Sequence, residues 1–359
     1  MTASVRVGVI GTSGWMDNSH LPMLKADPRV ELVAICGRNR ERAQEVATKY
    51  GIEPIFSDYR DMIAHSKMNA IVIGAPDDEH YAMTMHALDA GLHVLCEKPL
   101  ALNAADAKAM YEKAEGKQVR HMAFFTWRWM PHYRYMRELI TQGALGKLYH
   151  AQFSFLMGFG RNPQYQWRFD RKRSNGVVGD SGSHMFDLAR YLVGDIARIN
   201  AHVATLAEHQ GLNNEAPASD SAMALLEFAN GAQGIVQLST LARVDDIFLE
   251  QQVSLHGDAG SLIADLKVAG GPRLRLAKGD EPFQLLQIPD KYMSGVDESQ
   301  PFINSFVPMF VQQPIGCRLF VDAILESKPI EPSFYEGWKA QQVIDAALAS
   351  HDSGRWVDV

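Results

Sequence analysis

Two short stretches of the chain carry side chains suited to acid–base chemistry beside an alcohol or carbonyl oxygen. Lys98 lies in "HVLCEKPLAL" (93–102), where an apolar strand ends in an acid, a lysine and a proline. Asp180 and His184 lie in "GVVGDSGSHMFDLARYL" (176–192), and residues four apart on a helix share one face. Imidazole titrates near neutrality and an ammonium group stabilises negative charge, so these residue types suit proton transfer at an oxygen atom.

Each stretch also has a purely structural interpretation. Lys98 could be a surface lysine at a strand end, and Asp180 a helix cap with His184 on the helix surface. Asp187 could orient His184, or equally cap the helix or pair locally. A functional interpretation is favoured by the glycines that crowd the second stretch, as a backbone passing close to a ligand requires: Gly176, Gly179 and Gly182.

The elements that must position Lys98 alternate as strand and helix over about the first 125 residues. Their order predicts an open parallel sheet with helices on both faces, and ligands of such sheets bind at the carboxyl ends of the strands. Lys98 is therefore expected near a bound nucleotide. The expected strands are 5–10, 30–36, 69–75, 93–96 and 120–125.

The pattern changes after residue 126. A helix is expected over 131–146, a strand over 147–158 and a second helix over 183–194, and a helix over 335–352 closes the chain. Successive strands without helices between them indicate a large, mostly antiparallel open sheet. The sequence thus predicts a Rossmann-type domain over 1–125 and an α+β domain for substrate binding and oligomerisation over 126–359. The expected antiparallel strands are 198–206, 221–229, 232–242, 250–257 and 260–266.

Composition excludes several classes of function. The 359 residues carry a formal net charge of −7 and no basic run, which argues against nucleic acid as a partner. No apolar run is long enough to span a bilayer, and the N-terminus enters a strand at once, so a cytoplasmic protein is expected. The cysteines, Cys36, Cys96 and Cys317, are far apart and read as reduced core thiols, with no disulfide frame and no metal site.

The turn after the first strand, "GVIGTSGWM", is suited to a dinucleotide pyrophosphate. Gly11 permits the tight turn, and the amides that follow can face an anion at a helix N-terminus. The usual G-x-G-x-x-G pattern is altered, with Ser13 at the second glycine and Met16 at the third. The expected pyrophosphate contacts are Gly11, Thr12, Ser13, Gly14, Trp15 and Met16.

The end of the second strand predicts NADP(H) over NAD(H). An NAD site usually places an acid there for the ribose 2′-hydroxyl, but this chain has Gly37 followed by Arg38. A carboxylate would repel a 2′-phosphate, whereas a guanidinium binds one through charge and paired hydrogen bonds.

The chain resembles the Gfo/Idh/MocA family, the glucose–fructose oxidoreductase and inositol dehydrogenase group, over essentially its whole length. The resemblance rests on "GVIGTSG", "APDDEH", "CEKPL", "QWRFD" and "GDSGSHMFD". It implies that Lys98, Asp180 and His184 form the catalytic group of an NAD(P)-dependent oxidoreductase. It further implies cofactor contacts from Ala75, Pro76, His80, Glu97, Lys98, Trp167 and Arg168.

The reaction so implied is hydride transfer between the nicotinamide and a carbinol or carbonyl carbon of a sugar, sugar derivative or cyclitol. His184 is assigned as acid–base and Lys98 as the group that stabilises the oxygen, with Asp180 holding a neighbouring hydroxyl. The converse, with Lys98 as base, stays open. Aromatic faces and planar donors suit a polyol ring, so candidate sugar contacts, each of which could instead be packing, are Trp127, Arg128, Asn162 and Tyr165.

Two other functions remain open on the same fold: an NAD-dependent glycoside hydrolase, and a dinucleotide-sensing regulator without catalysis. The intact Lys98, Asp180 and His184 argue against the regulator. The resemblance also implies a homodimer or homotetramer, which the pairing of two uncovered apolar sheet faces would form.

Overall fold

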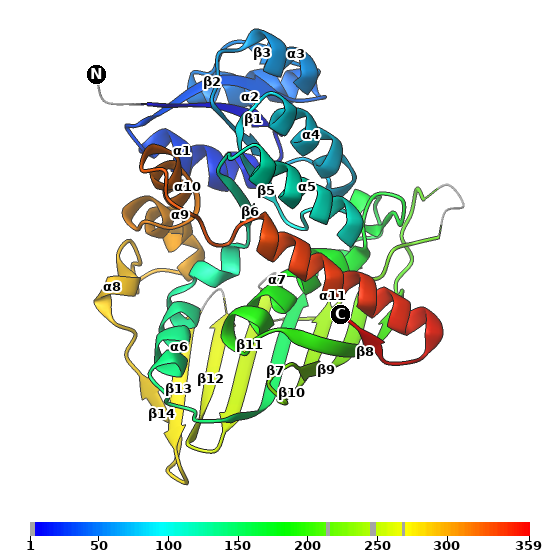
Figure 1. Ribbon diagram of the computed structural model, residues 1–359, viewed down its shortest axis with the longest axis vertical. Helices are drawn as coiled ribbons and strands as arrows, with labels where there is room; N and C mark the ends of the chain where they lie inside the picture. Colours follow the sequence, from blue (N-terminus) through cyan, green and yellow to red (C-terminus); the bar gives the residue numbers. More distant parts are fainter. Residues whose placement is uncertain (1–3, 213–215, 245–248, 268–269) are drawn as a thin grey trace. The chain divides into compact units, whose positions relative to one another are not determined.

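The N-terminal third of the chain builds a six-stranded parallel sheet with strand order β3-β2-β1-β4-β5-β6 in the computed structural model (Figure 1). The model describes residues 4–212, 216–244, 249–267 and 270–359. The strand β4, in the middle of this sheet, is apolar and buried at every position, as expected for a parallel strand covered on both faces. The strands are β1 Val5–Ile10, β2 Val30–Cys36, β3 Ile55–Phe56, β4 Ala70–Ile73, β5 His93–Glu97 and β6 His121–Phe124.

The strand order reverses between β1 and β4, because the chain leaves β1 first toward β2 and later toward β5. Right-handed crossovers in opposite directions place the helices on opposite faces of the sheet. In open sheets of this kind, ligands bind at such a reversal, outside the carboxyl ends of the strands, here those of β1 and β4. The helices are α1 Leu21–Ala26, α2 Arg40–Tyr50, α3 Tyr59–His65, α4 Asp77–Asp89 and α5 Ala104–Gly116.

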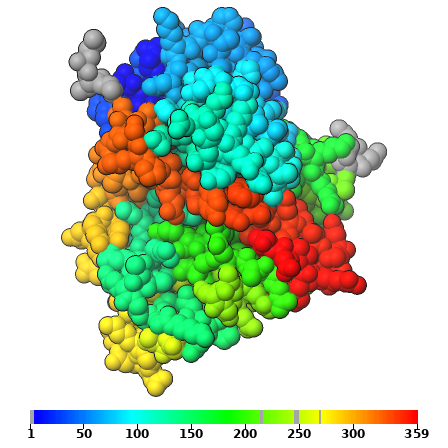
Figure 2. Space-filling model, in the orientation of Figure 1, coloured from blue at the N-terminus to red at the C-terminus, as the bar shows by residue number. Residues whose placement is uncertain are grey.

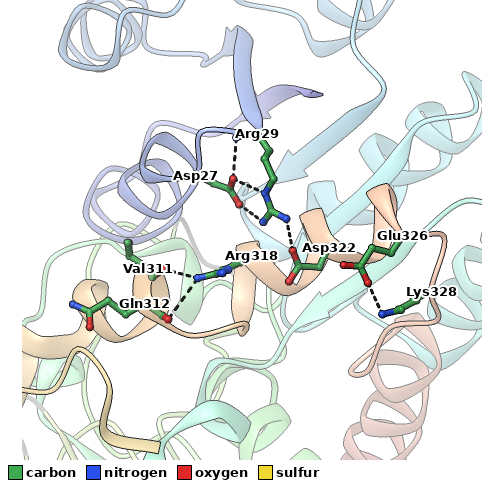
Figure 3. A network of polar contacts seen from close by, with 8 residues as sticks. All are labelled: Asp27, Arg29, Val311, Gln312, Arg318, Asp322, Glu326 and Lys328. Carbon is green, nitrogen blue, oxygen red and sulfur yellow. Dashed lines mark hydrogen bonds and ion pairs between the residues drawn. The ribbon is translucent and has the colours of Figure 1, made fainter. Parts of the chain in front are cut away.

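A late segment of the chain completes this first unit, which comprises Met1–Phe124 and Phe306–Trp338. It contains most of α9 (Phe302–Gln312) and α10 (Gly316–Leu325). In Figure 2 its orange side chains lie against the blue and cyan side chains of the N-terminal residues. Figure 3 shows one of the polar contacts, in which Arg29 binds Asp27 and donates to Asp322 of α10 at 2.7 Å.

The second unit comprises Phe125–Ser305 and Lys339–Val359. It is built on a nine-stranded sheet of order β14-β13-β12-β11-β7-β10-β9-β8-β15, in which β10 and β7 are parallel and the other pairs antiparallel. The strands are β7 Leu148–Met157, β8 Ile196–Ala204, β9 Ser221–Phe228, β10 Gln233–Ser239, β11 Leu249–Gly257, β12 Gly260–Lys267, β13 Gly271–Lys278, β14 Gln284–Leu286 and β15 Val357–Asp358.

One face of this sheet carries α6 (Pro131–Thr141) and α7 (Gly176–Leu192). α7 is buried along most of its length, which matches its run of glycine, serine and apolar residues. α11 (Phe334–Ser353) is tied to β8, since the Ser350 hydroxyl accepts from the Ala201 amide at 3.0 Å. A short helix, α8, spans Asp290–Met293.

The predicted fold class is confirmed, with differences in detail. The sequence patterns missed the two-residue edge strand β3, the strands β13, β14 and β15, and the helices of 302–325. α7 begins at Gly176, seven residues before the helix expected over 183–194. The first unit ends at Phe124, close to the boundary expected at residue 125. The segment Phe306–Trp338 also belongs to the first unit, so each unit is made of two separate segments of the chain.

Candidate active site

The turn after β1 is built around Gly11. Its φ of +115° lies in the region that glycine adopts without strain, and a Cβ there would lie 2.4 Å from the carbonyl oxygen of Gly74. The turn therefore passes directly over the end of β4. This close approach suits a backbone that presents its amides to a pyrophosphate, so the turn fits a dinucleotide.

The altered third glycine of the motif has a structural explanation. Met16 is fully buried, and its side chain occupies the space that a Cβ on Gly74 would fill, with Sδ 2.1 Å from that position. The close packing of helix and strand, which usually depends on a glycine in the motif, depends here on a glycine at the end of β4.

Met16 also begins a π-helical turn, Met16–His20, that two buried polar side chains anchor. The carboxylate of Asp17 bonds Lys49 and Arg42, each at 2.6 Å. Burial would raise the pKa of Asp17, but the bonds to these two cations hold it below its usual value. Arg42 also donates to the carbonyl oxygen of Thr12 at 3.2 Å, and it therefore stabilises the turn after β1.

His20 anchors the other side of the turn. Its Nε2 lies 2.6 Å from Glu97 Oε1, which also accepts from Trp15 Nε1 at 2.6 Å. Burial would raise the pKa of Glu97, but hydrogen bonds from both rings and the charge of Lys98 lower it. Sequence reasoning missed Asp17 and His20. Polar residues in the first helix after a glycine turn, where apolar packing is usual, were the available signal.

At the end of β2, Gly37 lies under the side chain of Thr12, whose Cγ2 is 2.7 Å from the position of a Cβ. Arg38 is two-thirds exposed, and its Nη1 pairs with Glu79 at 3.2 Å. The adenosine end of the expected cofactor site therefore presents a cation that is partly neutralised.

Lys98 begins the turn that follows β5, and the Lys98–Pro99 peptide bond is cis. Ala75 and Pro76 occupy the corresponding position after β4, where Pro76 precedes the first residue of α4. His80, in the first turn of α4, is fully buried, and main-chain carbonyl oxygens lie beside both of its ring nitrogens. The first unit therefore places the expected cofactor contacts of residues 1–125 at the carboxyl ends of the parallel strands. The ring of His80, however, is buried beneath this surface.

In the second unit, α7 carries Asp180 and His184 one turn apart. His184 is 7% exposed and is surrounded by the rings of Phe125, Trp127 and Phe155, with centroids 5.9–6.3 Å away. These rings make an apolar wall that excludes water from one side of the imidazole.

The carboxylate of Asp180 lies 3.5 Å from Nε of Arg168 in the short helix Trp167–Phe169. Arg168 also stacks on the ring of Trp167 at 4.4 Å. Asn162 and Tyr165 lie on the same loop, where Tyr165 is 47% exposed. The short helix thus lies beside α7 and brings Trp167 and Arg168 near Asp180, while the two expected sugar contacts lie earlier on the same loop.

Arg128 and Asp187 form a buried ion pair. The guanidinium binds the carboxylate through Nε at 2.6 Å and Nη2 at 2.8 Å, and the two residues are 5% and 1% exposed. Asp187 therefore has a local partner, which is one of the roles expected for it. The same pair gives Arg128, expected as a sugar contact, a structural role in the interior of the second unit.

Among the described residues, no three His, Cys, Asp or Glu side chains gather as metal ligands would. None of the helices in that part of the chain has the length and apolarity to cross a bilayer.

Comparisons with known proteins give matches for both parts of the chain. Residues 5–125 match the profile described as "Oxidoreductase family, NAD-binding Rossmann fold", and residues 133–263 match the "GFO/IDH/MocA C-terminal domain". Levoglucosan dehydrogenase of Pseudarthrobacter phenanthrenivorans is 27% identical over 99% of this chain and 98% of its own. D-glucoside 3-dehydrogenase of Escherichia coli is 31% identical over 67% of this chain and 71% of its own.

A solved structure of levoglucosan dehydrogenase with NADH and levoglucosan has a TM-score of 0.86 at 25% identity, with 99% of each chain covered.

Proposed function

The chain belongs to the Gfo/Idh/MocA oxidoreductase family, and we propose that it transfers a hydride between a nicotinamide cofactor and a carbinol or carbonyl carbon of a sugar, sugar derivative or cyclitol. The observation that carries this proposal is the arrangement on α7, where Asp180 forms an ion pair with Arg168 and His184 lies one turn away against an aromatic wall. The relatives named for levoglucosan and D-glucosides support a polyol substrate.

The nicotinamide, when bound, accepts or supplies the hydride. In oxidation His184 takes the hydroxyl proton and in reduction returns it, which suits a group whose ordinary pKa is near neutrality. Lys98 binds the reacting oxygen and stabilises its negative charge. Asp180 accepts a hydrogen bond from a neighbouring hydroxyl, in a direction set by Arg168.

A pH–rate comparison of His184→Ala and Lys98→Met tests these roles. With His184 as acid–base, His184→Ala loses kcat by about 10²–10⁴-fold and loses the limb of the profile that reports the imidazole. Near-normal kcat in His184→Ala, with that limb lost in Lys98→Met, would instead assign the proton transfer to the lysine.

We also propose that NADP(H) is preferred over NAD(H). No carboxylate stands at the end of β2, the Thr12 side chain fills the space beside Gly37, and the guanidinium of Arg38 is exposed. Because the similar solved structures hold NADH, kcat/KM must be compared for both cofactors. A clear preference for NAD(H) would reject this part of the proposal.

The substrate is identified by screening sugars, cyclitols and their keto forms with both cofactors, following absorbance of the reduced nicotinamide. Oxidation of at least one polyol is the expected result. Cleavage of a chromogenic glycoside without net cofactor turnover would indicate the hydrolase alternative.

The outer face of the nine-stranded sheet supports self-association. Met223, Leu225 and Ile235 are 59%, 49% and 45% exposed, and Leu225 lies directly opposite Ile235 in the register of β9 and β10. We propose that a second copy of the chain covers this face, because like surfaces can pair about a two-fold axis. Light scattering on Ile235→Lys tests this: a shift toward the monomer is expected, and a wild-type monomer of 39.9 kDa would exclude it.

The three cysteines are free and buried, which is consistent with our proposal that the protein is cytoplasmic.

A further inference from the structure

His80 is enclosed between the ends of two neighbouring strands. Its ring is 0% exposed, in the first turn of α4. Nδ1 lies 2.8 Å from the carbonyl oxygen of Pro99, and Nε2 lies 2.9 Å from the carbonyl oxygen of Ala75. One ring therefore bridges Pro99, which follows Lys98, and Ala75, which is the second residue after β4.

These two partners determine the protonation state of the ring. A carbonyl oxygen only accepts hydrogen bonds, so each ring nitrogen must carry a proton to bond its partner. A neutral imidazole has one N–H, and its other nitrogen would turn a lone pair toward an oxygen less than 3 Å away. Only the imidazolium satisfies both contacts.

The residues around the ring allow a buried cation. β4 is entirely apolar, and on β5 the titratable group that acts on the pKa of His80 is Cys96. The other titratable groups of β5 have their own partners, because His93 accepts from the Arg120 amide and Glu97 from Trp15. Asp77 lies one turn before His80 on α4. On α5, Lys108 pairs with Glu112, Lys113 with Asp89, and Asp106 bonds Asn103.

The balance of these contributions favours the charged form. Burial alone would lower the pKa of His80, but Cys96 and the two carbonyl groups raise it from 6.5 to about 9.

We propose that His80 is a buried imidazolium that holds the Lys98–Pro99 turn against the end of β4, and is thereby a positioning residue for Lys98. The ring is enclosed, so it acts through the two carbonyl groups and not by touching the cofactor. The effect on turnover rests on the proposed function, whereas the protonation state does not.

The first experiment measures the ring itself in the wild-type protein. Histidine ring nitrogens are labelled with ¹⁵N and observed by NMR from pH 6 to pH 8, with His80→Gln used only to assign the signal. We expect both His80 nitrogens to show protonated shifts across this range. A neutral tautomer at pH 7 overturns the proposal, whatever the enzyme proves to catalyse.

The second experiment tests positioning. Glutamine can donate to one carbonyl but turns its own oxygen toward the other, so His80→Gln should release one side of the turn. We expect kcat to fall about 10²-fold, as for a misplaced catalytic group, while the dissociation constant of the reduced cofactor changes less than threefold. His86→Gln on the same helix is the matched control, because that ring lies against the edge of Tyr59 and its loss should leave kcat unchanged.

A His80→Gln protein with wild-type kcat would overturn the positioning role. If that variant does not fold, His80→Asn and the pH profile of the wild type replace it. Loss of kcat should then accompany deprotonation of the NMR-observed ring above pH 8, and a ring that deprotonates without loss of kcat contradicts positioning.

Discussion

Removal of Asp187 should destabilise the protein strongly, because it would leave the guanidinium of Arg128 buried without its carboxylate. The two groups are 5% and 1% exposed and share two hydrogen bonds of 2.6 and 2.8 Å. Breaking a buried pair by deleting one partner costs about 3–5 kcal/mol, most of which is the penalty of an unpaired charge in the interior. We therefore expect Asp187→Ala to lower the free energy of unfolding by about that amount in urea titrations.

The double variant Arg128→Met/Asp187→Leu distinguishes this explanation from simple loss of packing. It removes both charges and keeps apolar volume, so it should recover most of the stability lost in Asp187→Ala. The exposed pair Arg198–Glu227 has the same two-bond geometry and serves as control. Glu227→Ala should change stability far less, because water solvates the remaining cation.

Two results would contradict an unpaired guanidinium as the cause of the stability loss. One is an Asp187→Ala protein whose stability changes no more than that of Glu227→Ala. The other is a double variant that is less stable than Asp187→Ala. If the double variant keeps the wild-type KM for the substrate, Arg128 stabilises the fold and does not bind the sugar.

Three further predictions concern the nucleotide end. Gly74→Ala should lower the free energy of unfolding by about 1–3 kcal/mol, because the new methyl group overpacks against Met16. The double variant Gly74→Ala/Met16→Ala should lose less stability than the sum of the two single variants, and additive losses would contradict the overlap. Arg38→Ala should lower kcat/KM for NADP about tenfold while sparing NAD, and Glu79→Gln should raise it, as steady-state kinetics with both cofactors will show. Glu97 has a lowered pKa, so its charge stabilises the fold above its ordinary value of 4.5, and this contribution is lost as pH falls through the lower folded value; urea midpoints at pH 7 and pH 4 should therefore differ more in the wild type than in Glu97→Gln.

Local patterns were sufficient for the elements that carry their own signal. The buried run of β4 and the alternating strands of the second sheet are each readable from a few consecutive residues. β3 has only two residues, too few to show a period. Residues 306–338 belong to the first unit through contacts such as Arg29 with Asp322, which are separated by almost the whole chain and leave no local pattern.

The candidate site divides in the same way. Asp180 and His184 could be assigned to one helix face because a helix relates neighbours four residues apart by local geometry alone. His20 and Glu97 are 77 residues apart, and nothing in either segment indicates the other. Met16 replaces the third glycine of the motif, and the compensating residue, Gly74, lies 58 positions further along the chain, so the two segments do not reveal each other.

Period, turn residues and motifs within short windows were thus enough to predict the fold class, most of the strands of both sheets and the residue types suited to proton transfer at an oxygen atom. Which polar groups meet in the interior became clear from the folded chain: Asp17 with its two cations, Arg128 with Asp187, and His80 with two carbonyl oxygens. The physical reason is that the state of a buried polar group depends on its partners in space. The same histidine is a surface base or an enclosed cation according to what surrounds it.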